Sequence, residues 1–219
     1  MSRTVQPRSY DSSSRRAQAL ANRARILEAA RGLFITNGFA ATSVTAIAAA
    51  AGVSAPTVFS AFGSKVNLLK EAAETTIVGD VEAVPMAERP EMRHVHAAPT
   101  ADELLDRLCD LLASRAPAVQ PIFAVMYGAR DGYPEIAELI DLLDEQRLSG
   151  ATGLARTLAA RLGTDDDDRI AELRDCIWAT MSPTWYESFV VKRGWSLEHY
   201  RAWVRAALQI PVDHPQPRS

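Results

Sequence analysis

The sequence predicts an all-α protein of about nine helices. Apolar residues recur every three or four positions along most of its 219 residues, as they do on the buried face of a helix. No stretch of any length alternates apolar and polar residues as a half-buried strand does. Ser, Thr or Pro precedes most of the periodic stretches and Gly follows several of them, which divides the pattern into separate helices.

The first part of the chain contains four of the expected helices. Residues 1–15 are rich in Ser and Arg and predict a disordered basic arm. A first helix is expected over 16–37, where Asn37 and Gly38 end the apolar pattern. Two short helices follow within 44–63. Ser64 caps a fourth helix that reaches about residue 81, so 16–81 form the predicted N-terminal domain.

The remaining helices form a predicted second domain over 82–210. Three prolines between residues 83 and 99 indicate a long connection with at most one short helical turn. Thr100 and Glu103 form a capping box that opens a helix, Pro117 is expected to open the next, and Pro134 starts a long one ending near residue 162. A further helix begins near residue 169 and is broken or kinked at Pro183. The last is expected over 197–210, with a flexible tail over 211–219.

Charge is distributed unevenly along the chain. Residues 1–70 carry a formal net charge of +7 and residues 71–219 one of −10, which together give −3. A basic N-terminal part followed by an acidic remainder is consistent with an N-terminal part that binds phosphate groups. No hydrophobic leader opens the sequence, and no run approaches the roughly 18–20 apolar residues that span a bilayer. We therefore expect a soluble, cytoplasmic protein without a membrane partner.

No metal or cofactor is expected. Cys109 and Cys176 lie within apolar helical patterns and lack metal-type spacing, so they are interpreted as core thiols. The acidic run 165–168 and the pair His94 and His96 are weak metal candidates, because the carboxylates splay apart and the histidines have no evident third ligand. The common nucleophile, phosphate-loop, zinc and dinucleotide motifs are absent, so the chain is not expected to be an enzyme.

Residues 44–63 predict two short helices that meet at a sharp angle. Gly52 can adopt the left-handed conformation in which the first helix ends. Ser54 is a good N-cap for the second helix, and Pro56 falls in its first turn. The alanines of the first helix allow close approach of the two. This pattern indicates a helix-turn-helix that binds DNA in preference to an ordinary helical hairpin.

The flanking residues extend this motif to a known family. Residues 23–80 resemble the DNA-binding domain of the tetracycline-repressor (TetR) family. The matching positions are Ile26, Ala29, Ala30, Phe34, Gly38, Thr42, Ser43, Ala50, Ala51, Gly52, Val53, Ser54, Thr57, Phe62, Gly63, Ser64, Lys65, Leu68 and Leu69. The resemblance implies a homodimeric repressor that binds a palindromic operator and is released by a small molecule. It covers about a quarter of the chain and does not identify the effector.

The motif and the resemblance together select a set of candidate DNA-binding residues. Lys65 is similar to the family's phosphate-contacting lysine, and the hydroxyls near the start of the second helix are placed for backbone contacts. Phe59 stands where the family usually has tyrosine, and the recognition helix lacks Arg, Asn and Gln, so direct base readout is thin. We therefore expect a contribution from the arm, which could equally be a solvated tail. The candidates are Thr42, Ser43, Thr45, Ser54, Ala55, Pro56, Thr57, Phe59, Ser60 and Lys65, with Arg15 and Arg16.

The second domain is expected to bind the effector and to dimerise. A pocket lined by apolar and aromatic side chains favours a small hydrophobic or aromatic effector, although each of these residues could simply be core. The candidate pocket residues are Cys109, Phe123, Met126, Tyr127, Trp178 and Met181. The last two helices are rich in aromatic residues, and the resemblance places the dimer interface there. The candidate interface residues are Trp185, Phe189, Tyr200, Trp203 and Val204.

One alternative from a different class stays open. The weak recognition helix and Phe59 are also compatible with a dimeric ligand-binding or interaction protein whose helix-turn-helix no longer reads DNA specifically. A substitution in the recognition helix distinguishes the two hypotheses, because it affects operator binding only in a regulator.

Overall fold

A computed structural model describes residues 12–79, 84 and 86–213, with only the backbone for residues 12–16 and 87. These residues form ten α-helices and no strand, which confirms the predicted all-α fold. The helices are α1 (Ser12–Ala41), α2 (Val44–Ala51), α3 (Ala55–Phe62), α4 (Lys65–Val78), α5 (Pro90–His96), α6 (Ala101–Ala129), α7 (Pro134–Leu162), α8 (Asp167–Thr180), α9 (Pro183–Tyr186) and α10 (Leu197–Asp213). Residues 1–11 and 214–219, which hold most of the predicted arm and tail, lie outside the described residues.

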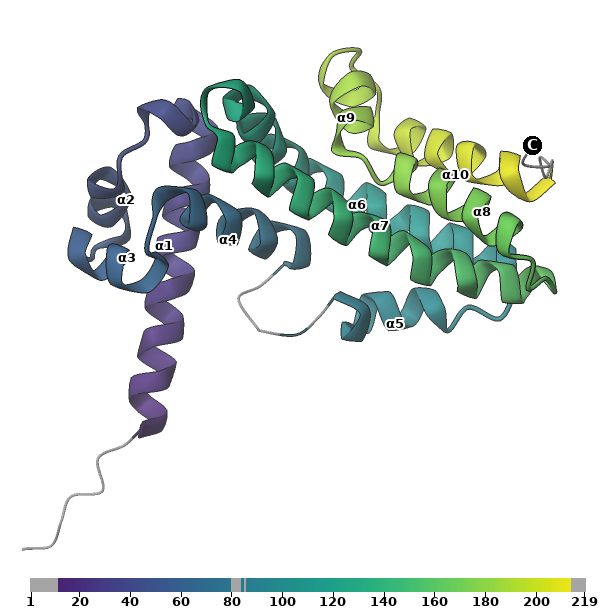
Figure 1. Cartoon of the computed structure of the whole chain (residues 1–219), viewed down its shortest axis with the longest axis horizontal. Helices are drawn as coiled ribbons and strands as arrows, with labels where there is room; N and C mark the ends of the chain where they lie inside the picture. The colour runs from purple at the N-terminus through teal and green to yellow at the C-terminus, as the bar shows by residue number, and fades with distance from the viewer. Residues whose placement is uncertain (1–11, 80–83, 85, 214–219) are drawn as a thin grey trace, which may run out of the picture.

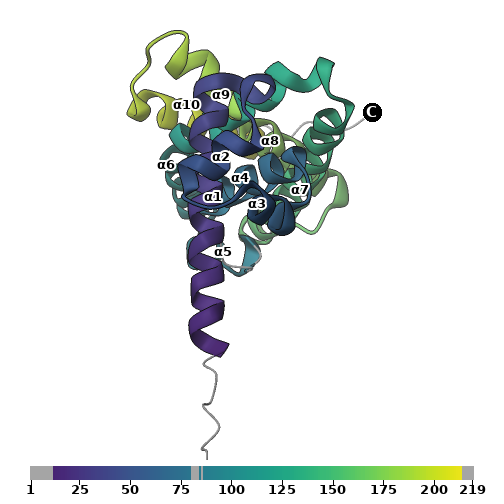
Figure 2. The same ribbon diagram turned by 90° about the vertical axis from the view of Figure 1, so that its left-hand side faces the viewer.

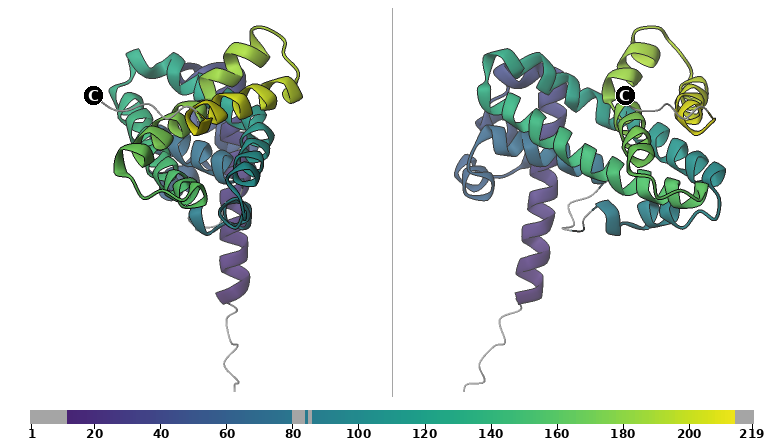
Figure 3. Two further views of the ribbon diagram at one scale, coloured as in Figure 1. Left: turned by 90° about the vertical axis from the view of Figure 1, so that its right-hand side faces the viewer. Right: turned by 45° about the vertical axis from the view of Figure 1, so that its right-hand side comes forward.

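The helices form two connected parts (Figure 1). Helix α1 stands as a rod, with α2 and α3 packed beside it and its N-terminal half projecting away from the other helices (Figure 2). We call α1–α4 the head. Helices α6 and α7 run side by side from the head to the far end of the molecule, where α8 and α10 pack across them (Figure 3). Helices α5–α10 are called the body.

Side-chain caps fix where the helices begin. The side chains of Ser43, Ser54, Ser64, Thr100 and Asp166 each accept a hydrogen bond from the backbone N–H three residues later, at 2.7–3.3 Å. Each bond satisfies an N–H that has no partner within its own helix. The predicted caps at Ser54, Ser64 and Thr100 are therefore confirmed.

Helix α6 differs from the sequence prediction, which placed a new helix at Pro117. The helix runs without interruption from Ala101 to Ala129 and contains both Pro117 and Pro121. A proline removes one backbone hydrogen bond and crowds the carbonyl four residues earlier. Here buried residues on both sides, among them Leu108 and Ile122, keep one continuous face in the core. Packing along the whole helix thus outweighs the local cost of the two prolines.

The chain between α4 and α6 is also more helical than predicted. Beyond a 3-10 turn at Met86–Glu88, α5 forms two turns of helix and buries Met92 and Val95 against the body. The fourth helix is shorter than expected, since α4 ends at Val78 with Gly79 in the left-handed conformation. Pro211 lies within α10 and does not begin a loose tail.

Pro183 ends α8 as predicted and leaves the Ala179 carbonyl without its helical partner. That carbonyl accepts two other hydrogen bonds, from the backbone N–H of Ser182 at 3.1 Å and from Trp185 Nε1 at 2.9 Å. The chain then continues through α9 into a π-helical segment, η3 (Glu187–Val191). The break is thus stabilised by a tryptophan that the sequence suggested as an interface residue.

Two clusters of buried side chains form the hydrophobic core. The first joins α1–α4 to the adjoining parts of α6 and α7, where Ile122, Met126 and Ile136 are fully buried. The second lies among α5, α6, α7, α8 and α10. Because the first cluster draws on both parts of the molecule, head and body are held together by apolar packing and not only by the chain connection.

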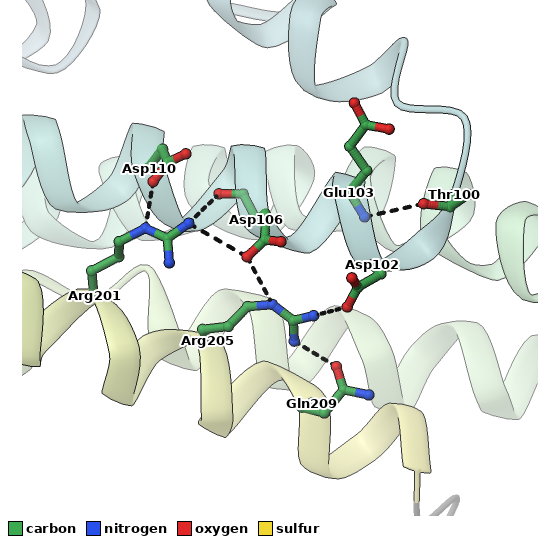
Figure 4. A network of polar contacts seen from close by, with 8 residues as sticks. All are labelled: Thr100, Asp102, Glu103, Asp106, Asp110, Arg201, Arg205 and Gln209. Atoms are coloured by element: carbon green, nitrogen blue, oxygen red, sulfur yellow. Dashed lines mark hydrogen bonds and ion pairs between the residues drawn. The ribbon is translucent and has the colours of Figure 1, made fainter.

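A ladder of charged side chains fastens α10 to α6 (Figure 4). Asp102, Asp106 and Asp110 lie four residues apart on α6 and face Arg201 and Arg205 of α10. Asp106 contacts both arginines, at 3.4 Å from Arg201 Nη2 and 3.2 Å from Arg205 Nε. The four-residue spacing repeats on both helices, so the charges meet along about two turns of each.

Candidate DNA-binding surface and ligand cavity

Helices α2 and α3 have the geometry of a helix-turn-helix. Their axes are bent by 106° at the turn, within the range of about 90–120° typical of the motif. Gly52 has φ 67° and ψ 37°, and the N–H of Val53 bonds to the carbonyl of Ala48 at 3.0 Å. No single helix in the described ranges is long and apolar enough to cross a bilayer. Helices α2 and α3 reach that length and apolar content only when they are taken together, and they are bent sharply at the turn.

Helix α3 buries one face and exposes the other. Val58 and Phe62 are 1% and 3% exposed and pack against the head core. Six predicted DNA-binding residues remain exposed on the start of α2 and on α3: Ser43, Thr45, Ser54, Pro56, Thr57 and Ser60. Ala55 is half-buried, and the exposed fraction of Phe59 is 52%. An aromatic side chain so exposed on a short amphipathic helix is available to a partner.

Thr42 corrects one prediction. It was expected to hydrogen-bond the DNA backbone, but it is only 2% exposed. Its hydroxyl lies 2.8 Å from the carbonyl oxygen of Gly38 and 3.1 Å from that of Leu33. Gly38 has φ 77° and ψ 169°, which interrupts α1 and turns the chain toward α2. Thr42 therefore stabilises this bend. A structural role accounts for a threonine at this position of the motif.

Lys65 has a structural role beside the predicted one. Its Nζ donates to the backbone carbonyls of Phe39 at 2.9 Å and Thr42 at 3.0 Å, and lies 4.1 Å from the centre of the Phe39 ring. Partial burial lowers the pKa of this ammonium. An ammonium has three N–H groups, so one remains for a phosphate oxygen. The prediction that Lys65 contacts phosphate stays compatible with this geometry.

Arg23 joins α1 to the end of α3 and to α4. Its guanidinium pairs with Glu71 and lies over the Phe62 ring, 4.6 Å from the ring centre. Beside it, an open groove of about 660 Å³ separates α1 from α3, with Asn22, Arg23, Thr57 and Ser60 on its walls. The side chains of Arg15 and Arg16 are outside the described residues, so their predicted DNA contacts stay predictions.

Besides the groove between α1 and α3, the molecule contains a cavity in the body with mainly apolar walls. Its volume is about 410 Å³, within the range of roughly 300–1,000 Å³ typical of small-molecule sites. Residues of α4, α5, α6, α7 and α10 line it, together with the segment that joins α8 to α9. Of the predicted pocket residues, Phe123, Tyr127 and Met181 belong to its wall. Glu74, Ile77 and Val78 bring α4, the last helix of the head, into the same wall.

The other three predicted pocket residues lie outside the wall. Cys109 and Met126 are fully buried in the second and first core clusters, and Trp178 packs beside Arg147. Burial raises the pKa of the Cys109 thiol to about 12, which suits a core residue. Arg147, which is not among the predicted pocket residues, does line the cavity. The signal was its position on the apolar stripe of α7, four residues after Leu143 and seven before Leu154.

The predicted interface residues divide into partly exposed and buried ones. Trp185, Phe189 and Trp203 form an aromatic cluster with ring centres 4.7–6.0 Å apart, and Trp185 is 37% exposed. Tyr200 and Val204 are 3% and 0% exposed, because they pack inside the body. Their assignment to an interface is therefore corrected: the same α10 stripe fills the core.

In the described part of the chain, no three or more His, Cys, Asp or Glu side chains are grouped so that they could hold a metal ion. His96 Nδ1 instead lies 2.8 Å from the Thr157 hydroxyl, and burial lowers the pKa of this imidazole.

These observations define a class of protein: a two-part all-α molecule with an exposed helix-turn-helix and a cavity that reaches the head. The sequence pattern of the bacterial regulatory proteins of the tetR family matches residues 26–72. The N-terminal domain is therefore that of this family of regulatory proteins. None of the curated proteins compared with the sequence matches it.

Several solved structures share the fold over nearly the whole chain. A transcriptional regulator of Rhodococcus sp. RHA1 is 25% identical, with 86% of this chain and 95% of that one covered and a TM-score of 0.59. FadR of Bacillus subtilis, in complex with stearoyl-CoA, is 18% identical, with coverage of 88% and 98% and a TM-score of 0.66. A regulator of Saccharomonospora viridis, in complex with choline, is 22% identical, with coverage of 88% and 96% and a TM-score of 0.58.

Proposed function

We propose that this chain is a homodimeric transcriptional repressor that binds a palindromic operator and is released by a small, largely apolar effector. The observation that carries the proposal is the position of α4. This helix begins at Lys65, directly after the recognition helix α3, and its last turns contribute Glu74, Ile77 and Val78 to the cavity wall. One rigid element therefore touches both the DNA-binding part and the cavity.

The coupling follows from this shared helix. A ligand that fills the cavity contacts Ile77 and Val78 and favours the arrangement of α4 that best accommodates it. Because Lys65 ties the start of α4 to the carbonyls of Phe39 and Thr42, a shift of α4 is passed to α1 and α2. In a dimer this changes the spacing of the two recognition helices, and the population shifts away from the DNA-binding form.

Related folds support an effector of this kind. The Bacillus subtilis and Saccharomonospora viridis regulators were solved with stearoyl-CoA and with choline, so bodies of this architecture hold chemically different small molecules. The cavity described above has mainly apolar walls with a few charged side chains. We infer a small molecule with a substantial apolar part as its ligand.

DNA binding is tested by selecting bound sequences from a random duplex pool and titrating the best one at several salt concentrations. An enriched palindrome with a steep salt dependence, about −0.9 in logarithmic slope for each phosphate contact, supports the proposal. Enrichment of no sequence, or equal binding of all sequences, contradicts it and favours the interaction protein without specific DNA binding.

Lys65→Gln examines the phosphate contact separately. Glutamine keeps a hydrogen-bond donor for the carbonyls of Phe39 and Thr42 but removes the positive charge. If Lys65 contacts phosphate in both subunits, the salt slope falls by about 1.8, which is twice the value for one contact. An unchanged slope with a fully folded variant restricts Lys65 to its structural role.

A further inference from the structure

Arg147 is an unusual member of the cavity wall. It occupies the apolar stripe of α7, and its side chain is only 17% exposed. Its Nη2 pairs with the carboxylate of Asp144 on the preceding turn. Its guanidinium lies over the indole of Trp178, 5.0 Å from the ring centre. The guanidinium is thus held by a carboxylate and by a ring face, and it is positioned before any ligand arrives.

Two donors in this group are without acceptors. Arg147 Nε and Trp178 Nε1 are both buried, and neither has a hydrogen-bond partner among the described residues. Guanidinium and indole N–H groups can only donate. Buried donors without a partner are costly and are rare in folded proteins. The partner that satisfies Arg147 Nε must therefore supply an oxygen or another acceptor.

The other polar groups of the wall are mostly engaged elsewhere. Arg115 donates to the Ile77 carbonyl and pairs with Glu91. Thr180 donates within its own helix, and the Ser182 hydroxyl bonds to that of Thr184. Burial raises the pKa of the Tyr127 hydroxyl, which keeps it protonated and able to donate. Tyr127 of α6 and Arg147 of α7 therefore both offer donors to a ligand.

Glu74 is the remaining carboxylate that could attract a cation. It lies on α4 with Lys70 Nζ at 3.9 Å, and burial raises its pKa. The ammonium of Lys70 offsets its negative charge. Much of the rest of the wall is aliphatic, including Leu108, Leu111 and Val119 of α6. A ligand with an apolar body and an acceptor at one end matches this distribution.

We propose, on the basis of the function proposed above, that the effector is an apolar molecule ending in a carbonyl or carboxylate group, whose oxygen binds Arg147. Asp144 and Trp178 act as positioning residues for the guanidinium. A carboxylate competes with Asp144 for the guanidinium, whereas a neutral carbonyl does not. Replacement of Asp144 therefore separates the two forms of the acceptor.

The experiment measures binding of three matched probes to the full chain without DNA, by calorimetry. Octanoate, methyl hexyl ketone and octylamine have the same number of carbons and differ in the polar group. We expect one or both oxygen-bearing probes to bind at least about tenfold more tightly than octylamine. Arg147→Met should remove this difference without weakening octylamine, because methionine preserves the apolar packing of the side chain.

Two further variants distinguish a binding role from a structural one. Asp144→Asn should leave the ketone unchanged and tighten octanoate if a carboxylate is the preferred group, whereas loss of a merely structural ion pair would weaken every probe. Trp178→Phe retains the ring beneath the guanidinium. It should preserve the preference for the oxygen-bearing probes.

The inference is overturned by any of three results: none of the probes binds, octylamine binds as tightly as the others, or Arg147→Met keeps the wild-type preference. Each of these results concerns the free protein only. The DNA selection described above is independent of them, so failure of this inference and failure of the proposed repressor function are distinguishable.

Discussion

Phe59 is the most exposed aromatic residue of the recognition helix, and it stands where the resemblance implies a tyrosine. Its ring is 52% exposed, so a hydroxyl added at its tip meets solvent or DNA and not the core. We expect Phe59→Tyr to tighten operator binding about two- to tenfold, which corresponds to one additional hydrogen bond. Fluorescence anisotropy on the selected operator measures this change.

The salt dependence provides the control for Phe59→Tyr. Tyrosine is neutral, so the slope of affinity against salt should stay as in the wild type while the affinity rises. The midpoint of thermal unfolding should also stay unchanged, because the site is exposed. Equal or weaker binding by the variant would show that this position does not face a phosphate.

At the level of single residues, the sequence identified which type of group is present but not what it contacts. Lys65 and Thr42 were both assigned to DNA because they match a DNA-binding motif, yet the hydroxyl of Thr42 is directed to carbonyls within the head. Arg147 was missed because a charged residue on an apolar stripe looks like an interruption. Its partner Asp144 lies one turn earlier on the same helix, but Trp178 comes from α8, and no local pattern specifies how α7 and α8 pack.

Among the elements, the turn between α2 and α3 depends on a single glycine. Gly52 has φ 67°, and a Cβ added there would have no atom within 4 Å, so only backbone strain opposes a side chain. We expect Gly52→Ala to lower the free energy of unfolding by about 1–2 kcal/mol. Gly32 is the matched control: it is exposed within α1, its Cβ would also meet nothing, and Gly32→Ala should stabilise by about 0.5–1 kcal/mol.

Denaturation with urea measures both glycine variants, and operator binding adds a second reading. Gly52→Ala should weaken DNA binding beyond its effect on stability, because the strain is relieved by changing the angle between α2 and α3. A Gly52→Ala protein as stable as the wild type would mean that the turn tolerates a different backbone conformation.

The ladder between α6 and α10 gives a second prediction at this scale. Asp106 contacts two arginines, whereas Asp110 contacts only Arg201. All these groups are partly exposed, and such pairs contribute about 0.2–1 kcal/mol each. We therefore expect Asp106→Asn to destabilise the protein by up to about 1 kcal/mol more than Asp110→Asn does. Both effects should shrink in high salt, and equal effects of the two variants would contradict the bridging role of Asp106.

The elements themselves were largely predictable, except near prolines. Helix caps such as Ser64 are local features, and the structure has them where the sequence predicts them. Pro117 was expected to open a new helix, but α6 passes through it and through Pro121 because its buried face continues on either side. Pro183 does end α8, where the chain turns away and Trp185 supplies a replacement donor. The local rule for proline is the same in each case, and tertiary packing decides the outcome.

For the whole molecule, the proposed dimer makes a direct prediction. Ile210 on α10 is 61% exposed and Leu20 on α1 is 47% exposed, so a charge at either position leaves the core intact. We expect light scattering to give a dimer for the wild type and for Leu20→Arg, and a larger monomer fraction for Ile210→Arg at the same concentration. A dimer unaffected by Ile210→Arg would place the interface on another surface.

The first core cluster also bears on how such a protein could be rebuilt. Phe34, Ile47 and Leu68 of the head share one packed interior with Ile122 and Met126 of α6. Removing the head would expose the apolar side of α6. A head taken from another regulator would pack poorly against α6 and α7, because their side chains fit the head of this chain. Chimeras that exchange DNA specificity should therefore carry the α6 and α7 residues of this cluster along with α1–α4. The part to be exchanged is therefore the whole first core cluster, and the segment that contains the helix-turn-helix is only a portion of it.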